Sequence, residues 1–181
     1  MLFDFSKAFD QIKHSILLQK LLQLGISRNF FLLLRDYLTG RCQIAKVNDS
    51  LSEKCPITSG VPQGSILGPL LFLVYINDLP NVVFSSLALM IADDLKLIHS
   101  CEKGCLGNLQ EDLDRLDRWS VQNHLYFNHK KLSYTEILTA RKKRSIEVGD
   151  IHMNQLAIKN KVVVRDVGLF IDEHLNWVEH V

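Results

Sequence analysis

The sequence predicts an α+β fold, and two observations carry this prediction. Segments with apolar residues at helical spacing are mixed with short apolar runs of strand length. Near the middle of the chain, two such runs, 87–91 and 95–98, flank Asp93 and Asp94, a pattern typical of a β-hairpin. Helices combined with a hairpin indicate an antiparallel sheet packed on helices, which is the α+β class.

The first half of the chain is predicted to hold one short strand and three helices. The apolar run 2–5 is short enough to be a buried strand that ends at an aspartate. Apolar spacing after Asp10 predicts a helix that stops at Gly25, and the same spacing predicts helices over 29–38 and 70–79. Between the last two helices, residues 42–58 alternate as strands do, and 59–68 form a glycine-rich loop.

The second half is predicted to contain an amphipathic helix followed by strands. Residues 107–123 place apolar side chains on one face. The charged residues of this helix are expected to form its solvated face: Glu111, Asp112, Asp114, Arg115, Asp117 and Arg118. Short apolar runs after Ser145 indicate further strands.

Length and composition are typical of a globular protein. The 181 residues suffice for one domain with a core, and 47% hydrophobic with 23% charged residues argues against disorder. No apolar run approaches the ~18 residues of a membrane span, and no secretory signal is evident, so we expect an intracellular protein without a membrane segment. The cysteines form no C-x-x-C pair, which favours reduced thiols over a zinc site; they are Cys42, Cys55, Cys101 and Cys105.

The net charge of +1 does not by itself indicate a nucleic-acid-binding protein. Such proteins usually carry a basic surplus, because much of their affinity comes from contacts with phosphates. Basic residues are clustered only locally, at 130–131 and 141–144.

Three aspartates are candidate metal ligands. Asp93 and Asp94 follow an apolar strand, and adjacent carboxylates that repel each other are useful mainly where a cation binds them. Asp4 ends a second apolar strand and is the candidate third ligand. Taken singly, each has an ordinary alternative, because Asp4 can cap the following helix and an Asp-Asp pair can form a solvated turn.

The loop 59–69 is the third unusual feature. Its sequence is S-G-V-P-Q-G-S-I-L-G-P, with the amide side chain of Gln63 between glycines. Glycines allow a backbone to approach a ligand closely, but the loop lacks the G-K-[ST] ending of a phosphate-binding P-loop. Turn formation alone would explain the glycines, though not the apolar helix that follows at once.

Five segments in order resemble the motifs of reverse transcriptases from jockey-type, LINE-like elements. The segments are D-F-S-K-A-F-D at 4–10 followed by H-S-I-L-L at 14–18, S-G-V-P-Q-G-S-I-L-G-P-L-L-F at 59–72 continuing to 80, A-D-D at 92–94, L-D-R-L-D-R-W at 113–119 leading to Phe127, Asn128 and Lys131, and D-V-G at 166–168 leading to L-N-W at 175–177. The second segment is long and distinctive. Together they cover nearly the whole chain.

The resemblance implies a polymerase palm with a catalytic Asp-Asp hairpin. Asp4, Asp93 and Asp94 would be the catalytic carboxylates that hold two Mg²⁺ ions, for which Mn²⁺ can substitute. Phe9 would lie under the sugar of the incoming nucleotide and screen against a 2′-hydroxyl. The other residues expected to contact nucleotide or template are Phe5, Gln63, Gly64 and Lys131. The implied partners are an RNA template, a DNA primer and dNTPs.

The sequence departs from the family pattern without losing a carboxylate. Ile91 stands where an aromatic residue is usual, Leu95 where threonine is common, and Leu132 where threonine or cysteine is expected. On this resemblance, residues 1–140 are expected to be the palm, without the preceding fingers, and 141–181 its end and the connection to a thumb. We therefore expect the chain to be inactive in isolation.

Two alternatives to an active polymerase remain open on the sequence. One is a non-catalytic remnant of a retroelement with at most weak binding of nucleic acid or a partner, which the departures favour. The other is an unrelated metal-dependent phosphotransferase, which would need a nucleotide-binding loop that the sequence does not show.

Overall fold

The computed structural model describes residues 1–100, 106–137 and 150–175 of the chain. The chain forms two compact units, Met1–Ser6 with Leu79–Gln122 and Tyr126–Val181, and Lys7–Asp78 with Asn123–Leu125. Both helices and sheets are present, so the predicted α+β class is confirmed.

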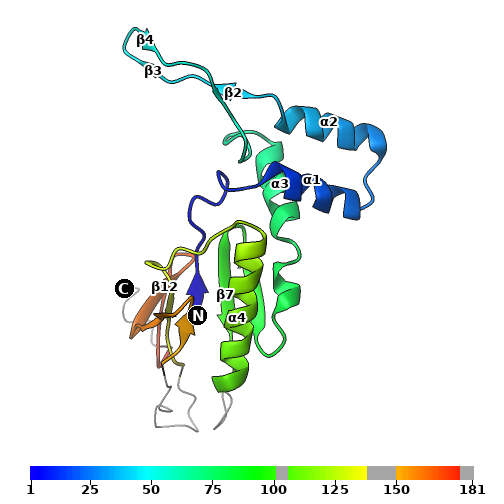
Figure 1. Cartoon of the computed structure of the whole chain (residues 1–181). Helices are drawn as coiled ribbons and strands as arrows, with labels where there is room; N and C mark the ends of the chain where they lie inside the picture. The colour runs from blue at the N-terminus through cyan, green and yellow to red at the C-terminus, as the bar shows by residue number, and fades with distance from the viewer. Residues whose placement is uncertain (101–105, 138–149, 176–181) are drawn as a thin grey trace. The chain divides into compact units, whose positions relative to one another are not determined.

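A five-stranded sheet forms the centre of the first unit (Figure 1). In spatial order its strands are β11 (Lys159–Asn160), β8 (Ser133–Tyr134), β1 (Leu2–Phe3), β7 (Asp94–Ile98) and β6 (Leu87–Ile91). The pairings from β8 to β6 are antiparallel as predicted, whereas β11 pairs with β8 in parallel. Between β8 and β11 in the sequence, β9 (His152–Met153) and β10 (Leu156–Ala157) pair as an antiparallel hairpin.

The amphipathic helix α4 (Leu106–Gln122) also belongs to the first unit. It packs against the 3₁₀ turn η1 (Leu79–Val82) and against β9. Its apolar face is buried as predicted, through Leu109, Leu113, Leu116 and Trp119. A second hairpin, β12 (Val163–Asp166) with β13 (Leu169–Asp172), completes the unit.

The prediction that all charged residues of α4 are solvated is wrong for Asp112. This residue is fully buried, and its carboxylate accepts hydrogen bonds from the backbone N–H groups of Phe84 and Ser85. The helical pattern does not show these donors, because they come from a segment far from the helix in sequence.

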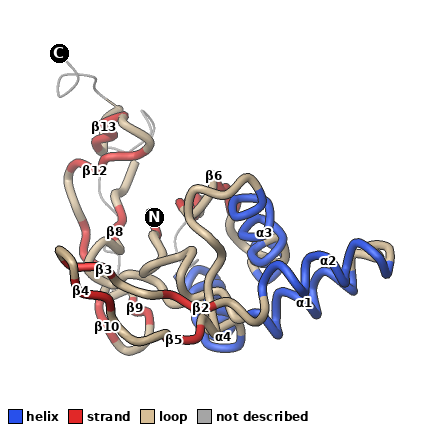
Figure 2. The backbone as a smooth tube through the Cα atoms, turned by 90° about the horizontal axis from the view of Figure 1, so that it is seen from above, coloured by secondary structure: helices blue, strands red, loops and turns tan. Residues whose placement is uncertain are grey.

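The second unit contains helices and, over residues 42–56, an arm of short strands, which Figure 2 shows in blue and red. The helices are α1 (His14–Gln23), α2 (Arg28–Leu38) and α3 (Leu67–Ile76). α3 begins three residues earlier than the predicted Leu70, because Pro69 lies in the first helical turn, where no backbone N–H is required. The arm pairs β2 (Cys42–Gln43) with β5 (Cys55–Pro56) and β3 (Lys46–Val47) with β4 (Ser50–Leu51), and its strand residues are exposed.

Contacts between α1 and α3 stabilise the second unit. Leu17 and Leu21 of α1 and Phe72 of α3 are buried. The Nζ of Lys20 donates to the backbone oxygen of Tyr75 and also pairs with Asp78 at 2.7 Å.

No helix in the described ranges combines the length and the apolar character that crossing a bilayer requires. Cys42 and Cys55 are exposed free thiols, whereas Cys101 and Cys105 lie outside the described residues. The basic run at 141–144 and the end of the fifth motif, at 176–177, also lie outside them.

Candidate functional site

The β6–β7 hairpin presents the two adjacent aspartates at its tip. Ile91 pairs with Asp94, so Ala92 and Asp93 form the turn and Asp94 is the first residue of β7. The turn therefore lies one residue earlier than predicted. Ala92 has a φ of 54°, a left-handed conformation that is costly for a residue with a side chain.

Asp4 follows β1, the neighbour of β7 in the sheet. Leu2 pairs with Lys96 and Phe3 with Leu95, and extending this antiparallel register by one residue sets Asp4 beside Asp94. On its other side, the backbone oxygen of Asp4 accepts a hydrogen bond of 2.7 Å from the N–H of Asn128. Asp4 thus lies between the Asp-Asp hairpin and the segment that leads to Lys131.

The carboxylates lie close enough to influence one another. Desolvation raises the pKa of Asp94 above its ordinary value, and so do the negative charges of Asp93, Asp4 and Asp166, against the opposing charge of Lys131. The Nζ of Lys131 pairs with Oδ2 of Asp4 at 2.5 Å, and this hydrogen bond raises the pKa of the lysine. The structure therefore brings together the predicted residues Asp4, Asp93, Asp94 and Lys131.

Asp166 is a fourth carboxylate near this group, and its place in the fifth motif does not predict a role in the site. It is buried on β12 and forms an ion pair with Lys96 of β7. Alternation along β12 could have indicated its burial, because Asp166 shares a face with the buried Val164.

A cavity of ≈ 670 Å³ adjoins these groups in the first unit. Three carboxylates line it: Asp4, Asp94 and Asp166. Five cationic side chains also line it: Lys96, Lys130, Lys131, Lys161 and Arg165. The lining is therefore suited to an anionic ligand, although the net charge of the whole chain is only +1.

The other predicted site residues have different surroundings. The ring of Phe5 is buried in the first unit and stacks on Phe127 at 4.8 Å between centroids. In the second unit, the partly exposed Phe9 packs against Phe72, also at 4.8 Å. Gln63 is exposed and donates from Nε2 to Oδ1 of Asp10 at 2.9 Å.

Residues 1–159 match the family described as reverse transcriptase (RNA-dependent DNA polymerase). The chain belongs to the reverse transcriptase family. It is similar to the probable RNA-directed DNA polymerases from transposon X-element (27% identity) and transposon BS (30%), and to the RNA-directed DNA polymerase from mobile element jockey (26%), all of Drosophila melanogaster. The predicted resemblance to jockey-type reverse transcriptases is thus confirmed.

Each of these alignments covers 98% of the chain but 20% of the relative. The chain therefore spans about a fifth of the length of the curated relatives it matches.

The donor set of this reverse transcriptase domain fits a hard divalent cation in its chemistry. Carboxylate oxygens are the ligands that Mg²⁺ prefers, and the ammonium of Lys131 already places a positive charge against Asp4. Among the described residues, however, no three His, Cys, Asp or Glu side chains are grouped closely enough to hold a metal ion together. Binding at this position would thus require Lys131 to leave Asp4 and the carboxylates to converge.

The glycine-rich loop of the reverse transcriptase domain is anchored at Gly60. The backbone oxygen of Gly60 lies 2.8 Å from Nε2 of the buried His14 and accepts a bond of 3.2 Å from Arg41. A Cβ added at Gly60 would lie 3.0 Å from Cα of Asp10 and 3.0 Å from the oxygen of Phe9. Close packing as well as its φ of 83° therefore requires glycine here.

Gly60→Ala is expected to destabilise the domain more than Gly64→Ala does. Gly64 has a similar φ of 79°, but no atom lies within 4 Å of an added Cβ, so it serves as the matched control for backbone strain. We expect strain of about 1–2 kcal/mol in both variants and at least ~1 kcal/mol more in Gly60→Ala from overpacking. Urea unfolding of the two variants measures the difference, and equal losses would show that the packing around Gly60 is unimportant.

Proposed function

We propose that the chain is the palm of an RNA-directed DNA polymerase, which adds dNTPs to a primer 3′-hydroxyl on an RNA template. The observation that carries this proposal is the placement of Asp4 beside Asp94 across β1 and β7, with Asp93 in the adjoining turn. Three carboxylates from two sequence-distant segments suit nucleotidyl transfer, which needs clustered metal ligands rather than a serine or histidine nucleophile.

Asp4, Asp93 and Asp94 would hold two Mg²⁺ ions, with Mn²⁺ as a substitute. When bound, such ions favour deprotonation of the primer hydroxyl and stabilise the charge on the leaving pyrophosphate. Once the carboxylates have converged on the ions, their attachment to a hydrogen-bonded sheet would hold them in place during the reaction.

Cationic side chains of the cavity would receive the phosphates. Lys131 is 66% exposed in its side chain and can exchange Asp4 for a triphosphate oxygen once a metal neutralises that carboxylate. Phe9 would screen the sugar, and Gln63 and Gly64 would lie against the templating pair. Because the ring of Phe5 is buried, any contact of Phe5 with the nucleotide would be made by its main chain.

In this proposal, residues 1–140 form the palm and 141–181 its end, leading to a thumb. Polymerisation depends on holding template, primer and triphosphate together, and the chain corresponds to only 20% of its curated relatives. We therefore propose that the chain alone does not extend a primer.

A non-catalytic remnant is the second candidate function. The ion pair between Lys131 and Asp4, with no assembled group of three metal ligands in the described part of the chain, favours it. A chain of this kind would keep the fold without a metal response, which gives a direct way to separate the two candidates.

Mg²⁺ or Mn²⁺ is expected to raise the melting temperature of the chain. Desolvation and the neighbouring carboxylates both raise the pKa of Asp94, and a bound cation would relieve the repulsion between these carboxylates. Asp93→Asn combined with Asp94→Asn should abolish this rise, as followed by differential scanning calorimetry. Asp49→Asn with Glu53→Gln, on the exposed arm, changes the net charge equally and should leave the rise intact. A metal response that survives in the Asp93/Asp94 double variant would contradict the proposed site.

A further inference from the structure

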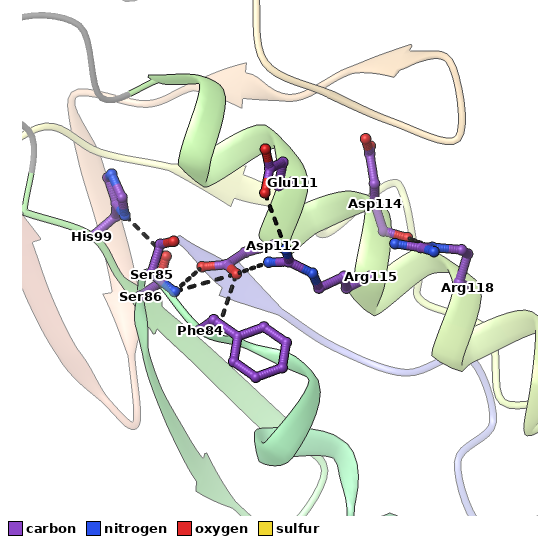
Figure 3. A network of polar contacts seen from close by, with 9 residues as sticks. All are labelled: Phe84, Ser85, Ser86, His99, Glu111, Asp112, Asp114, Arg115 and Arg118. Atoms are coloured by element: carbon purple, nitrogen blue, oxygen red, sulfur yellow. Dashed lines mark hydrogen bonds and ion pairs between the residues drawn. The ribbon is translucent and has the colours of Figure 1, made fainter.

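The buried carboxylate of Asp112 lies at the centre of a polar network between α4 and the segment before β6 (Figure 3). Its oxygens accept hydrogen bonds from the N–H groups of Phe84 at 2.9 Å and Ser85 at 3.0 Å. Burial alone would raise the pKa of Asp112, but bonds from Phe84, Ser86, Ser85 and Arg115 together hold it below its ordinary value. Asp112 is therefore a charged residue that several hydrogen bonds link to the segment before β6. This set of hydrogen bonds is called the tie.

Arg115 reinforces this tie from the same helix. One guanidinium nitrogen donates to Asp112 at 3.0 Å, and another donates to Glu111 at 3.0 Å. The guanidinium also lies over the ring of Phe84, 4.8 Å from its centroid. Asp112 and Arg115 thus hold the backbone and the side chain of the same short segment, which limits how far that segment can shift.

The network includes both strand ends at the open end of the β6–β7 hairpin. Ser86, directly before β6, lies with Oγ 3.0 Å from Nδ1 of His99, directly after β7. Asp112 bonds to the neighbouring Ser85 and also interacts with Ser86. Both strands are consequently fixed at the end opposite the Ala92–Asp93 turn.

β6 has particular need of this tie because it is an edge strand. Among the strands that the structure describes, β7 alone pairs with it, and its side chains at Leu87, Leu89 and Ile91 are exposed. Little packing therefore fixes β6 beyond its ladder with β7.

We propose that Asp112 is a positioning residue that fixes the base of the β6–β7 hairpin and thereby the place of Asp93 and Asp94 at its tip. A catalytic role for Asp93 and Asp94 at this position rests on the proposed function, whereas the effect of Asp112 on the hairpin does not. Because a buried carboxylate that loses a donor is costly, the tie should resist local opening of the hairpin.

Amide hydrogen exchange of the full chain tests the tie without any metal. In Asp112→Asn, an amide group replaces one acceptor with a donor, so we expect exchange at least about tenfold faster at Phe84 and Ser85 and along β6 and β7 as far as Asp94. Asp114→Asn is the control, because Asp114 is exposed on the same helix and bonds only to Gln110 among the contacts of its side chain that the structure shows. Unchanged exchange at Asp94, with or without faster exchange at Phe84, would overturn the proposal.

Arg115→Lys is a second variant, for use if Asp112→Asn does not fold, as shown by the loss of cooperative unfolding. This variant keeps the positive charge and Asp112 but loses the forked contact and the position over Phe84. We therefore expect a smaller increase in amide exchange, at the same residues.

Mn²⁺ binding, followed through the EPR signal of the free ion, should weaken at least threefold in either variant and not in Asp114→Asn. If amide exchange at Asp94 becomes faster while the affinity for Mn²⁺ stays the same, the positioning role is also overturned.

The two readouts distinguish the two proposals. A wild-type chain that binds no Mn²⁺ contradicts the proposed function, while exchange at Asp94 still decides whether Asp112 positions the hairpin tip.

Discussion

Replacing Asp94 by asparagine is expected to abolish template-directed DNA synthesis when the chain is carried within a complete polymerase of its family. Asp94 lies beside Asp4 and near Asp93, and desolvation together with these neighbouring negative charges raises its pKa. An asparagine has nearly the same shape but cannot supply an anionic oxygen to a cation. We expect kcat/KM to fall at least ~1,000-fold, since charge stabilisation of the transition state would be lost.

Primer extension on a poly(rA) template with Mg²⁺ measures this loss. Asp114→Asn, which removes the same charge from the exposed face of α4, should retain the activity of the parent enzyme. Synthesis by the Asp94→Asn enzyme within tenfold of the parent would show that this carboxylate is not a ligand of the reactive metal.

Substitution of Phe9 by valine is expected to admit ribonucleotides in the same complete enzyme. The Phe9 ring packs on Phe72 and remains partly exposed, so it has a fixed position and a free face for a sugar. A shorter side chain would open space for a 2′-hydroxyl. We expect the ratio of kcat/KM for rNTP to that for dNTP to rise about 10- to 100-fold, the range that differences of a few carbon atoms in a pocket produce.

Single-nucleotide incorporation of matched rNTP and dNTP measures the ratio directly. Phe30→Val provides the control, because Phe30 is an exposed phenylalanine of α2. If both substrates slow equally in Phe9→Val, the ring supports the fold and does not select the sugar.

The sequence was sufficient to predict those elements whose apolar spacing is regular. The helices α1, α2 and α4 and the strands β6 and β7 lie close to where periodicity places them. The three helices and β7 bury apolar side chains in their units, whereas β6 is held by its pairing with β7. The start of α3 was less predictable, since a proline in the first turn is compatible with a helix that begins before it or after it.

The charged residues inside the fold could not be predicted in the same way. Helical spacing alone predicts that Asp112 is a surface residue. It is buried instead, because the backbone N–H groups of Phe84 and Ser85 donate hydrogen bonds to its carboxylate. Asp166 is buried because Lys96, 70 residues away in sequence, reaches it. In both cases a tertiary contact offsets the desolvation of the charge, and no local pattern records such a contact.

The candidate site was predictable from the order of its motifs, but its present arrangement was not. The motifs indicated Asp4, Asp93, Asp94 and Lys131, and the register of β1 on β7 gives a physical reason for their proximity. Net charge was a poor guide, because five cationic and three acidic side chains line one cavity, while the charge of the whole chain is only +1.

Anomalous diffraction from crystals of the chain grown with Mn²⁺ tests the central claim most directly. If the domain is a polymerase palm, manganese should lie in contact with carboxylate oxygens of Asp4 and of Asp93 or Asp94, and Lys131 should have left Asp4. Manganese bound only elsewhere, or Asp4 still paired with Lys131 at saturating Mn²⁺, would contradict the claim.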